Sequence, residues 1–267
     1  MNKGLAFWLR DFQIHCSYRF ELLLEVFSTV LTLMSYYFLA RFVGNSVNSD
    51  VQKYGGNYFA YVLIGIALQE YLIAPLQLFS RHIRESQLNG TLEALLSTQT
   101  PTRTVILGST LYPFTRASIN VAIYLGLSLT LLGLRLSAVN WFGAILTLIF
   151  AMATFSGIGI LSASFILIFK RGEPITWVIN ALTWIFAGVL FPVSTLPHWL
   201  RTVSAILPIR YAIDAMRGAV LHNASWSELS QSLFPLFACA VVIVPLSLAV
   251  FEYANKWVRT VGSLPDY

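Results

Sequence analysis

The chain has 267 residues, of which 57% are hydrophobic and only 11% charged, and its mean hydropathy is +0.69. Soluble domains are typically about 45–50% apolar and about 25% charged, so this composition excludes an ordinary soluble domain and indicates a membrane protein. We expect the net charge of +5 to lie in loops beside membrane spans, where it favours anionic lipid, and we expect no nucleic-acid partner.

The first predicted element, residues 1–21, is an amphipathic helix that lies in the membrane interface. Its apolar face carries Leu5, Trp8, Leu9, Phe12, Cys16 and Phe20. Aromatic residues on such a face favour the boundary between headgroups and acyl chains.

Residues 22–258 are predicted to form one all-α domain with six membrane spans. About 20 apolar residues cross the hydrocarbon core. Six runs are long enough, and they cover approximately residues 22–43, 58–79, 105–133, 141–169, 175–191 and 233–253. An even number of spans places both termini on the same side of the membrane.

Lysine and arginine residues are divided unequally between the two sides of this arrangement. One side holds Lys3, Arg10, Arg19, Arg81, Arg84, Arg103, Lys170, Arg171, Lys256 and Arg259. The other holds Arg41, Lys53, Arg135, Arg201, Arg210 and Arg217. Because positive loops remain in the cytosol, we expect the termini and the loop 81–103 to be cytosolic, in a cell (plasma or inner) membrane.

The loop 81–103 contains a short predicted helix, Thr91–Ser97. Glu93 favours its N-terminus and Pro101 prevents it from continuing. Leu92, Leu95 and Leu96 share one face. A helix of this kind either docks on a partner protein or lies on lipid headgroups, and its spacing alone does not decide between the two.

Between the fifth and sixth spans, two short amphipathic helices are predicted at Pro197–Leu207 and Ile209–Leu221. Both are too short to cross, which is typical of helices that enter the outer leaflet and return. In the second, Asp214 is spaced to bridge Arg210 and Arg217. We favour a structural role for these charges over contact with a substrate.

The deepest ionisable residues are Glu70 and Arg116. Since charges within a membrane are costly alone, our hypothesis is that these two pair between the second and third spans. The alternative is that one of them faces a polar translocation path. The fourth span also carries small residues at close-packing spacing, from Ala153 to Gly157 and from Gly159 to Ala163, which favours packing within one protomer over a dimer interface.

Several enzyme classes lack support in the sequence. It contains no G-x-x-x-x-G-K-[ST] phosphate-binding loop, and its four histidines lie outside the predicted spans. We therefore expect no catalytic or metal site and no cofactor bound by this chain.

Two segments together resemble a known family. Gly90-Thr-Leu-Glu-Ala-Leu-Leu96, followed by Thr100-Pro101 and Val105-Ile-Leu-Gly108, is similar to the cytosolic loop of type-2 ABC exporter permeases. Leu207-Pro-Ile-Arg-Tyr-Ala-Ile-Asp-Ala-Met-Arg-Gly218, after Phe191-Pro192 and Leu196-Pro197, is similar to the segment between the last two spans of that family.

The resemblance implies a permease subunit without its own ATPase site, driven by two separate cytosolic ABC ATPase subunits that bind ATP and magnesium. It implies a second permease copy, usually identical, and a surrounding lipid bilayer. By this resemblance the ATPase-coupling residues are Gly90, Thr91, Leu92, Glu93, Leu95 and Leu96. The outer re-entrant signature is Pro208, Arg210, Tyr211, Asp214, Arg217 and Gly218.

For the cargo, the apolar spans favour a hydrophobic or amphipathic molecule, such as a drug or a lipid. Export of a polysaccharide or glycolipid by the same family is the first alternative. An ATP-independent membrane scaffold is the second.

Overall fold

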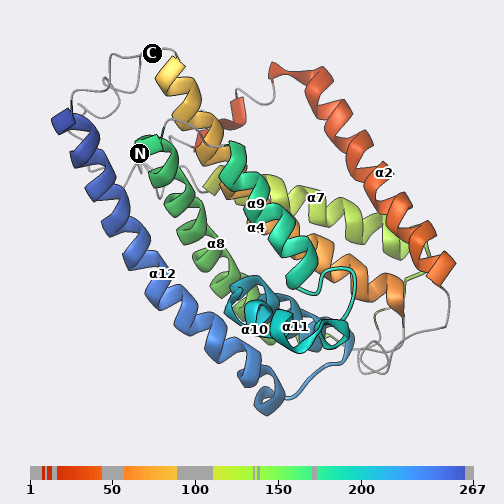
Figure 1. The fold of residues 1–267 in the computed structure, drawn as a ribbon. Coiled ribbons are helices and arrows are strands. Elements are labelled where there is room, and N and C mark those ends of the chain that lie inside the picture. Colours follow the sequence, from red (N-terminus) through yellow and green to blue (C-terminus); the bar gives the residue numbers. More distant parts are fainter. Residues whose placement is uncertain are drawn as a thin grey trace.

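The computed structural model describes residues 8–9, 11–13, 17–43, 57–88, 111–134, 136, 139–169 and 173–261. Every regular element in these ranges is helical (Figure 1). The helices at the predicted spans are α2 (Arg19–Val43), α4 (Tyr58–Leu88), α7 (Leu111–Thr130), α8 (Trp141–Phe169), α9 (Glu173–Phe186) and α12 (Trp226–Val261). Between α9 and α12 lie η1 (Val193–Thr195), α10 (His198–Ile206) and α11 (Pro208–Leu221).

Polar side chains define where three long helices begin. The Asn57 side-chain oxygen accepts a hydrogen bond from the Ala60 amide at 3.2 Å, and that of Asn140 accepts one from the Gly143 amide at 3.0 Å. Both are N-caps that satisfy an amide of the first helical turn. At the start of α12, Glu228 accepts from the Ser225 amide at 2.9 Å, which is half of a capping box.

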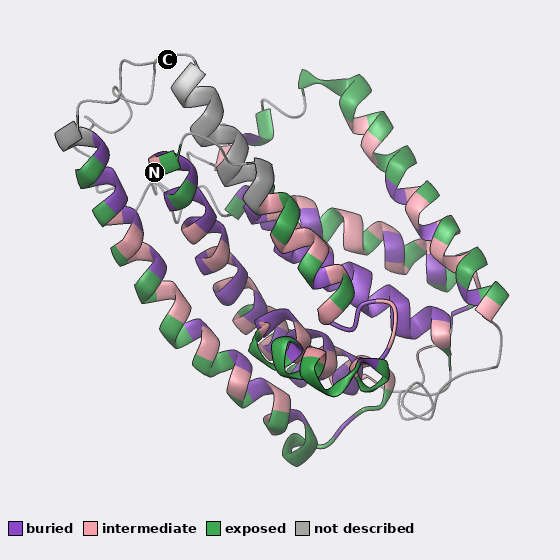
Figure 2. Ribbon diagram, in the orientation of Figure 1, coloured by how far each residue is buried: buried purple, intermediate pink, exposed green. Residues whose placement is uncertain are grey.

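Helix α4 lies at the centre of the bundle. It contacts α2, α7, α8, α9 and α11, and its residues 59–69 are all buried (Figure 2). Helices α2 and α12 lie at opposite edges and expose many leucine, valine and phenylalanine side chains. Such apolar outer faces are expected of helices that contact lipid.

The small residues of α8 pack against α12 of the same chain. A Cβ atom added at Gly157 would lie 2.7 Å from Ile243 Cγ2, and Ala163 belongs to a buried cluster with Phe251 and Ala254. Packing within one protomer, the interpretation that we favoured from the sequence, is confirmed for these residues.

Four of the described helices are long and apolar enough to cross a membrane, namely Arg19–Val43, the Tyr58–Gln77 part of α4, Trp141–Phe169 and the Trp226–Val258 part of α12. Helices α7 and α9 occupy the positions of the predicted third and fifth spans.

Several helix boundaries differ from the prediction. Helix α4 continues past residue 79 to Leu88, and α12 runs from Trp226 to Val261 rather than from about residue 233 to residue 253. Helix α9 ends at Phe186 rather than continuing to residue 191, since Gly188 has a φ of 76°, a left-handed conformation that an α-helix cannot contain. At 14 residues, α9 is about 21 Å long and too short to cross the core alone.

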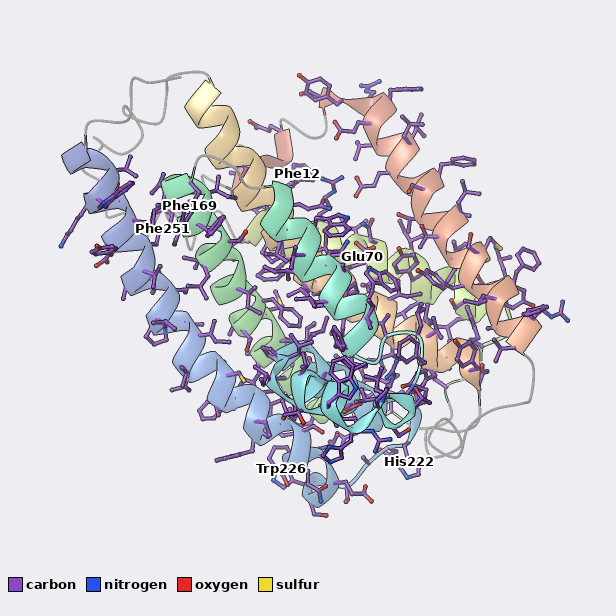
Figure 3. All side chains as sticks on the ribbon, viewed as in Figure 1. Phe12, Glu70, Phe169, His222, Trp226 and Phe251 are labelled. Carbon is purple, nitrogen blue, oxygen red and sulfur yellow. The ribbon has the colours of Figure 1, made fainter. Side chains whose placement is uncertain are left out.

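One end of the bundle is closed by α10 and α11, which form where two short helices were predicted. We call this end the outer cap, after the outward orientation that the sequence predicts for it. The starts of α4 and α8 lie at this end. The Asn140 amide donates to the Ala219 carbonyl at 2.8 Å, and the Tyr58 hydroxyl donates to the Leu190 carbonyl at 2.8 Å. Figure 3 shows His222 and Trp226 at this end and Phe169 and Phe251 toward the other.

Candidate functional site

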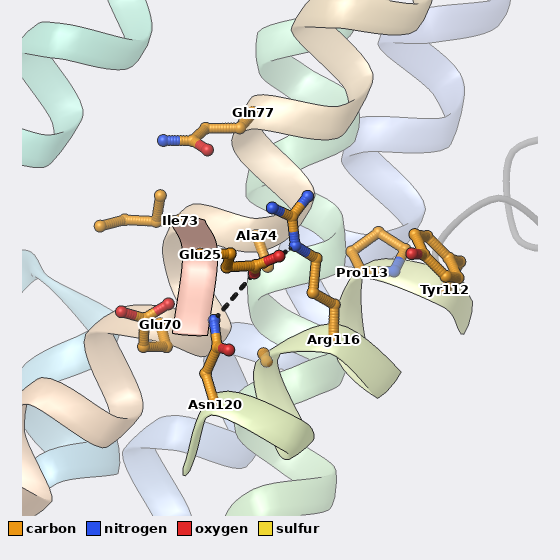
Figure 4. A pocket seen from close by; sticks show the side chains of 10 residues that line it. Glu25, Glu70, Ile73, Ala74, Gln77, Tyr112, Pro113, Arg116 and Asn120 are labelled. Carbon is orange, nitrogen blue, oxygen red and sulfur yellow. Dashed lines mark hydrogen bonds and ion pairs between the residues drawn. The ribbon is translucent and has the colours of Figure 1, made fainter. Parts of the chain in front are cut away.

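A surface lined by several polar side chains lies among α2, α4 and α7. A cavity of about 130 Å³ here is lined in part by Glu25, Glu70, Arg116 and Asn120 (Figure 4). A more open groove of about 370 Å³ is lined by the same four residues. We call the two together the polar groove. The wider part is further lined by Glu21, Leu24, Ser28, Thr29 and Thr32 of α2 and by Tyr124 of α7.

An ion pair belongs to the lining that the two parts of the groove share. Arg116 Nε is 2.5 Å from Glu25 Oε1, and the Asn120 amide donates to the same oxygen at 3.3 Å. Our hypothesis that Arg116 pairs with Glu70 is therefore corrected, because Arg116 forms its ion pair with Glu25 of α2. The pair joins α2 to α7, and because the two charges are opposite, each lowers the cost of burying the other.

Glu70 lines the same groove but is held differently. It accepts a hydrogen bond from the Tyr124 hydroxyl at 3.1 Å. Arg116, Asn120 and Tyr124 follow one another at intervals of four residues, so they share one face of α7, and that face points toward α2 and α4. This spacing was visible in the sequence. Glu25 was overlooked because it lies close to the cytosolic end of its predicted span.

Gln69, next to Glu70, points to the other side of α4. Its side chain is 1% exposed and donates to Asn180 Oδ1 at 3.0 Å and to Thr183 Oγ1 at 2.6 Å. These bonds tie α9 to the middle of α4. Of these two consecutive residues of α4, Gln69 therefore holds α9 through its carboxamide, and Glu70 faces the polar groove with its carboxylate.

Arg217 is the most deeply buried charged side chain of the outer cap, at 1% exposure. Its guanidinium donates to the carbonyls of Tyr61, Gly188 and Val189 at 2.9–3.1 Å and lies over the Tyr61 ring. A Cβ atom at Gly65 would meet the Val189 carbonyl oxygen at 2.7 Å, so only glycine permits this approach. These contacts agree with the structural role that we favoured for the charges of this segment.

Side chains also satisfy the carbonyls beyond the end of α9. Ser204 Oγ donates to the Phe186 carbonyl at 2.6 Å, Arg217 donates to Gly188 and Val189, and Tyr58 donates to Leu190. Non-helical backbone at membrane depth requires such partners, because lipid offers none.

The other signature residues have local roles in the outer cap. Pro208 occupies the first turn of α11, and Arg210 Nε lies 3.7 Å from Asp214 Oδ2. The Tyr211 hydroxyl donates to the Ala205 carbonyl at 2.8 Å, and a Cβ atom at Gly218 would lie 3.3 Å from Leu229 Cδ2.

Of the N-terminal helix predicted over residues 1–21, only parts are described. Trp8 and Phe12 stack with ring centroids 5.1 Å apart, and the Trp8 indole donates to Thr115 Oγ1 of α7 at 3.0 Å. The predicted coupling residues Gly90–Leu96 lie outside the described residues.

Residues 5–221 match the family model described as ABC-2 type transporter. The chain belongs to the ABC-2 type transporter family. The match runs from the N-terminal segment through α11 and thus contains both segments on which the sequence resemblance depends. No curated protein with which the chain was compared matches it.

Membership in this family indicates which subunit of a transporter the chain forms. Proteins of this family are the multi-pass transmembrane subunits, and they act with ABC ATPase subunits that hydrolyse the nucleotide. Among the described residues, no three histidine, cysteine or acidic side chains are grouped so that they could hold a metal ion.

Proposed function

We propose that this chain is the permease subunit of an ATP-driven exporter that moves a hydrophobic or amphipathic molecule out of the cytoplasm or the inner leaflet. The observation that carries the proposal is the family match over residues 5–221. The polar groove adds to it, because charged side chains gathered between helices of the membrane-spanning region typically mark a path for a polar group.

We further propose six crossings. Four crossings are the helices that are long and apolar enough by themselves. The fifth is α7, which is about 30 Å long, and the sixth is α9 together with residues 187–190, where side chains satisfy backbone carbonyls. The start of α8 contacts α11, and the start of α4 contacts the segment after α9, so successive long helices run in opposite directions. This alternation supports six crossings with both termini on the cytosolic side.

Helix α4 offers a physical connection between the ATPase and the outer cap. Its 31 residues extend about 46 Å, more than the roughly 30 Å hydrocarbon core, so it projects beyond the membrane toward the predicted coupling residues Gly90–Leu96. In our proposal these residues dock on the ATPase, whose closure on ATP binding displaces the cytosolic end of α4. Transmission requires contacts that differ between the two states of the complex.

The complete transporter in this proposal has two permease copies and two cytosolic ATPase subunits that hold ATP and magnesium. A second copy agrees with the exposure of α2, in which only Thr29, Leu33 and Ala40 are buried within its own chain.

Co-expression with a candidate ABC ATPase, followed by purification and reconstitution in lipid vesicles, tests the proposal. We expect the two subunits to co-purify and ATP hydrolysis to increase in the presence of a transported amphiphile. An ATPase with the catalytic glutamate replaced provides the background. Failure of every candidate ATPase to co-purify would support the ATP-independent scaffold instead.

A further inference from the structure

We propose that the polar groove binds the positively charged headgroup of an amphiphile, with Glu70 as its principal contact. This inference rests on the proposed export function and names the class of cargo. It is carried by three observations: the shape of the groove, its charge, and the apolar surface beside it.

The groove has room for a headgroup and is accessible. Its wider part has a volume of about 370 Å³ and is bounded on one side by a polar face of α2, to which Glu21, Ser28 and Thr32 belong. Glu21 and Ser28 are exposed. Polar side chains on the exposed face of a spanning helix are costly against lipid hydrocarbon, so this face is suited to water or to a polar group of a ligand.

The charge of the groove selects the sign of the ligand. Three carboxylates, Glu21, Glu25 and Glu70, line it together with one guanidinium, Arg116. Arg116 forms its ion pair with Glu25, and the hydrogen bond that Glu70 accepts from Tyr124 comes from an uncharged hydroxyl, so the lining carries more carboxylates than cations. This excess of carboxylates would repel a phosphate or sulfate headgroup. An ammonium group would instead be attracted and would balance the excess negative charge.

The surface beside the groove indicates that the cation carries a hydrocarbon chain. Leu24, Phe27 and Leu31 form a stripe on α2 next to the face that carries Glu21 and Ser28, and each is at least half exposed. Leu24 also lines the groove itself. A ligand with its ammonium group near Glu70 can therefore lay its alkyl chain along this apolar stripe, within the surrounding acyl chains.

Equilibrium binding of radiolabelled dodecyltrimethylammonium to the permease alone, in nanodiscs of neutral phosphatidylcholine, tests the inference without nucleotide. Empty nanodiscs correct for partition into lipid. We expect saturable binding that unlabelled dodecyltrimethylammonium displaces and dodecyl sulfate does not. Tetramethylammonium, which has no chain, is expected to displace the label at least about a hundredfold less effectively, which distinguishes a leaflet amphiphile from an aqueous cation.

Three variants locate the site. Glu70→Gln is expected to raise the dissociation constant at least about tenfold, and Glu21→Gln, at an exposed position where folding is not at risk, about threefold. Glu228→Gln removes an equal charge from the exposed start of α12, distant from the groove, and is expected to leave binding unchanged.

Equal affinity of the wild type and both groove variants, or equal displacement by dodecyl sulfate, would overturn the inference. Its failure is distinguishable from failure of the proposed function. A permease that co-purifies with an ATPase but does not bind the cation contradicts only the cargo class. A chain that binds the cation in the groove but recruits no ATPase contradicts only the export function.

Discussion

Arg217 shows how a single side chain can determine the local path of the chain. From α11 it reaches the Tyr61 carbonyl of α4 and the Gly188 and Val189 carbonyls that follow α9. Without it, these buried acceptors would lose their donor, which costs about 1–3 kcal/mol for each group. The cation stabilises the outer cap by satisfying several backbone acceptors at once.

We therefore expect Arg217→Met to destabilise the protein by at least about 3 kcal/mol, which corresponds to a thermal midpoint lowered by roughly 6–12 °C. The thermal midpoint is measured by heating the detergent-solubilised protein and quantifying the remaining folded fraction by size-exclusion chromatography. Arg210→Met is the matched control, since Arg210 is partly exposed and pairs at 3.7 Å, and it should cost at most about 1 kcal/mol. Similar losses for both variants would refute the special role of Arg217.

The ion pair of Glu25 and Arg116 makes a second prediction at this scale. Glu25→Arg places two guanidiniums together and is expected to lower stability by about 1–2 kcal/mol, a modest loss because Arg116 is 35% exposed. The double variant Glu25→Arg/Arg116→Glu restores opposite charges and should recover at least half of the loss. A double variant no more stable than the poorer single variant would rule out direct pairing.

These residues also show what the sequence could and could not predict about the site. Glu70 and Arg116 were identified because charges are rare within apolar runs, and the structure places both in the polar groove. The partner of Arg116 could not be predicted, because it depends on how α2 lies against α7, and that arrangement is tertiary. Similarly, the local spacing of Asp214 and Arg217 gave no indication that Arg217 reaches α4.

Among the helices, the accuracy of prediction depended on where the boundary signals lie. Helix α8 has the predicted bounds, since Asn140 caps its start and Lys170 and Arg171 follow its end. The end of α9 was placed five residues too late, because hydropathy continues through Leu190 while the backbone turns at Gly188. The extra turns of α12 follow from the Ser225–Glu228 cap.

The contact of α8 with α12 can be tested by changing the size of one residue. Gly157→Leu is expected to force the helices apart and to lower stability by about 1–3 kcal/mol, since even a Cβ atom would meet Ile243. Gly126→Leu in α7 is the control, because nothing lies within 4 Å of its added Cβ. Should Gly157→Leu instead leave the midpoint unchanged and alter only the oligomeric state, the small residues would belong to an interface between copies.

The continuity of α4 leads to a prediction about coupling. Glu93→Arg or Leu95→Arg should reduce stimulated ATP hydrolysis, or co-purification of the ATPase, by at least about tenfold. Membrane insertion and monodispersity should remain as in the wild type. The expectation follows from the proposed docking of residues 90–96, where a reversed charge or a buried cation would be unfavourable. Full activity in both variants would remove this segment from the mechanism.

In the whole molecule, the central helix α4 connects three features of this ABC-2 permease. Its start contacts the outer cap, its middle faces the polar groove and holds α9, and its end projects toward the loop that we propose for ATPase docking. Motion of this helix would therefore reach the groove and the cap together. The central claim is that the loop lies in the cytosol and that α7 crosses the membrane.

Cysteine labelling in intact cells tests this claim most directly, in a chain whose Cys16 and Cys239 are replaced by serine. Ser97→Cys is expected to react with an impermeant maleimide only after permeabilisation, and Ser137→Cys, between α7 and α8, is expected to react from outside. Labelling of Ser97→Cys in intact cells would place the loop on the wrong side. Protection of Ser137→Cys until permeabilisation would mean that α7 does not cross, and either result would contradict the account.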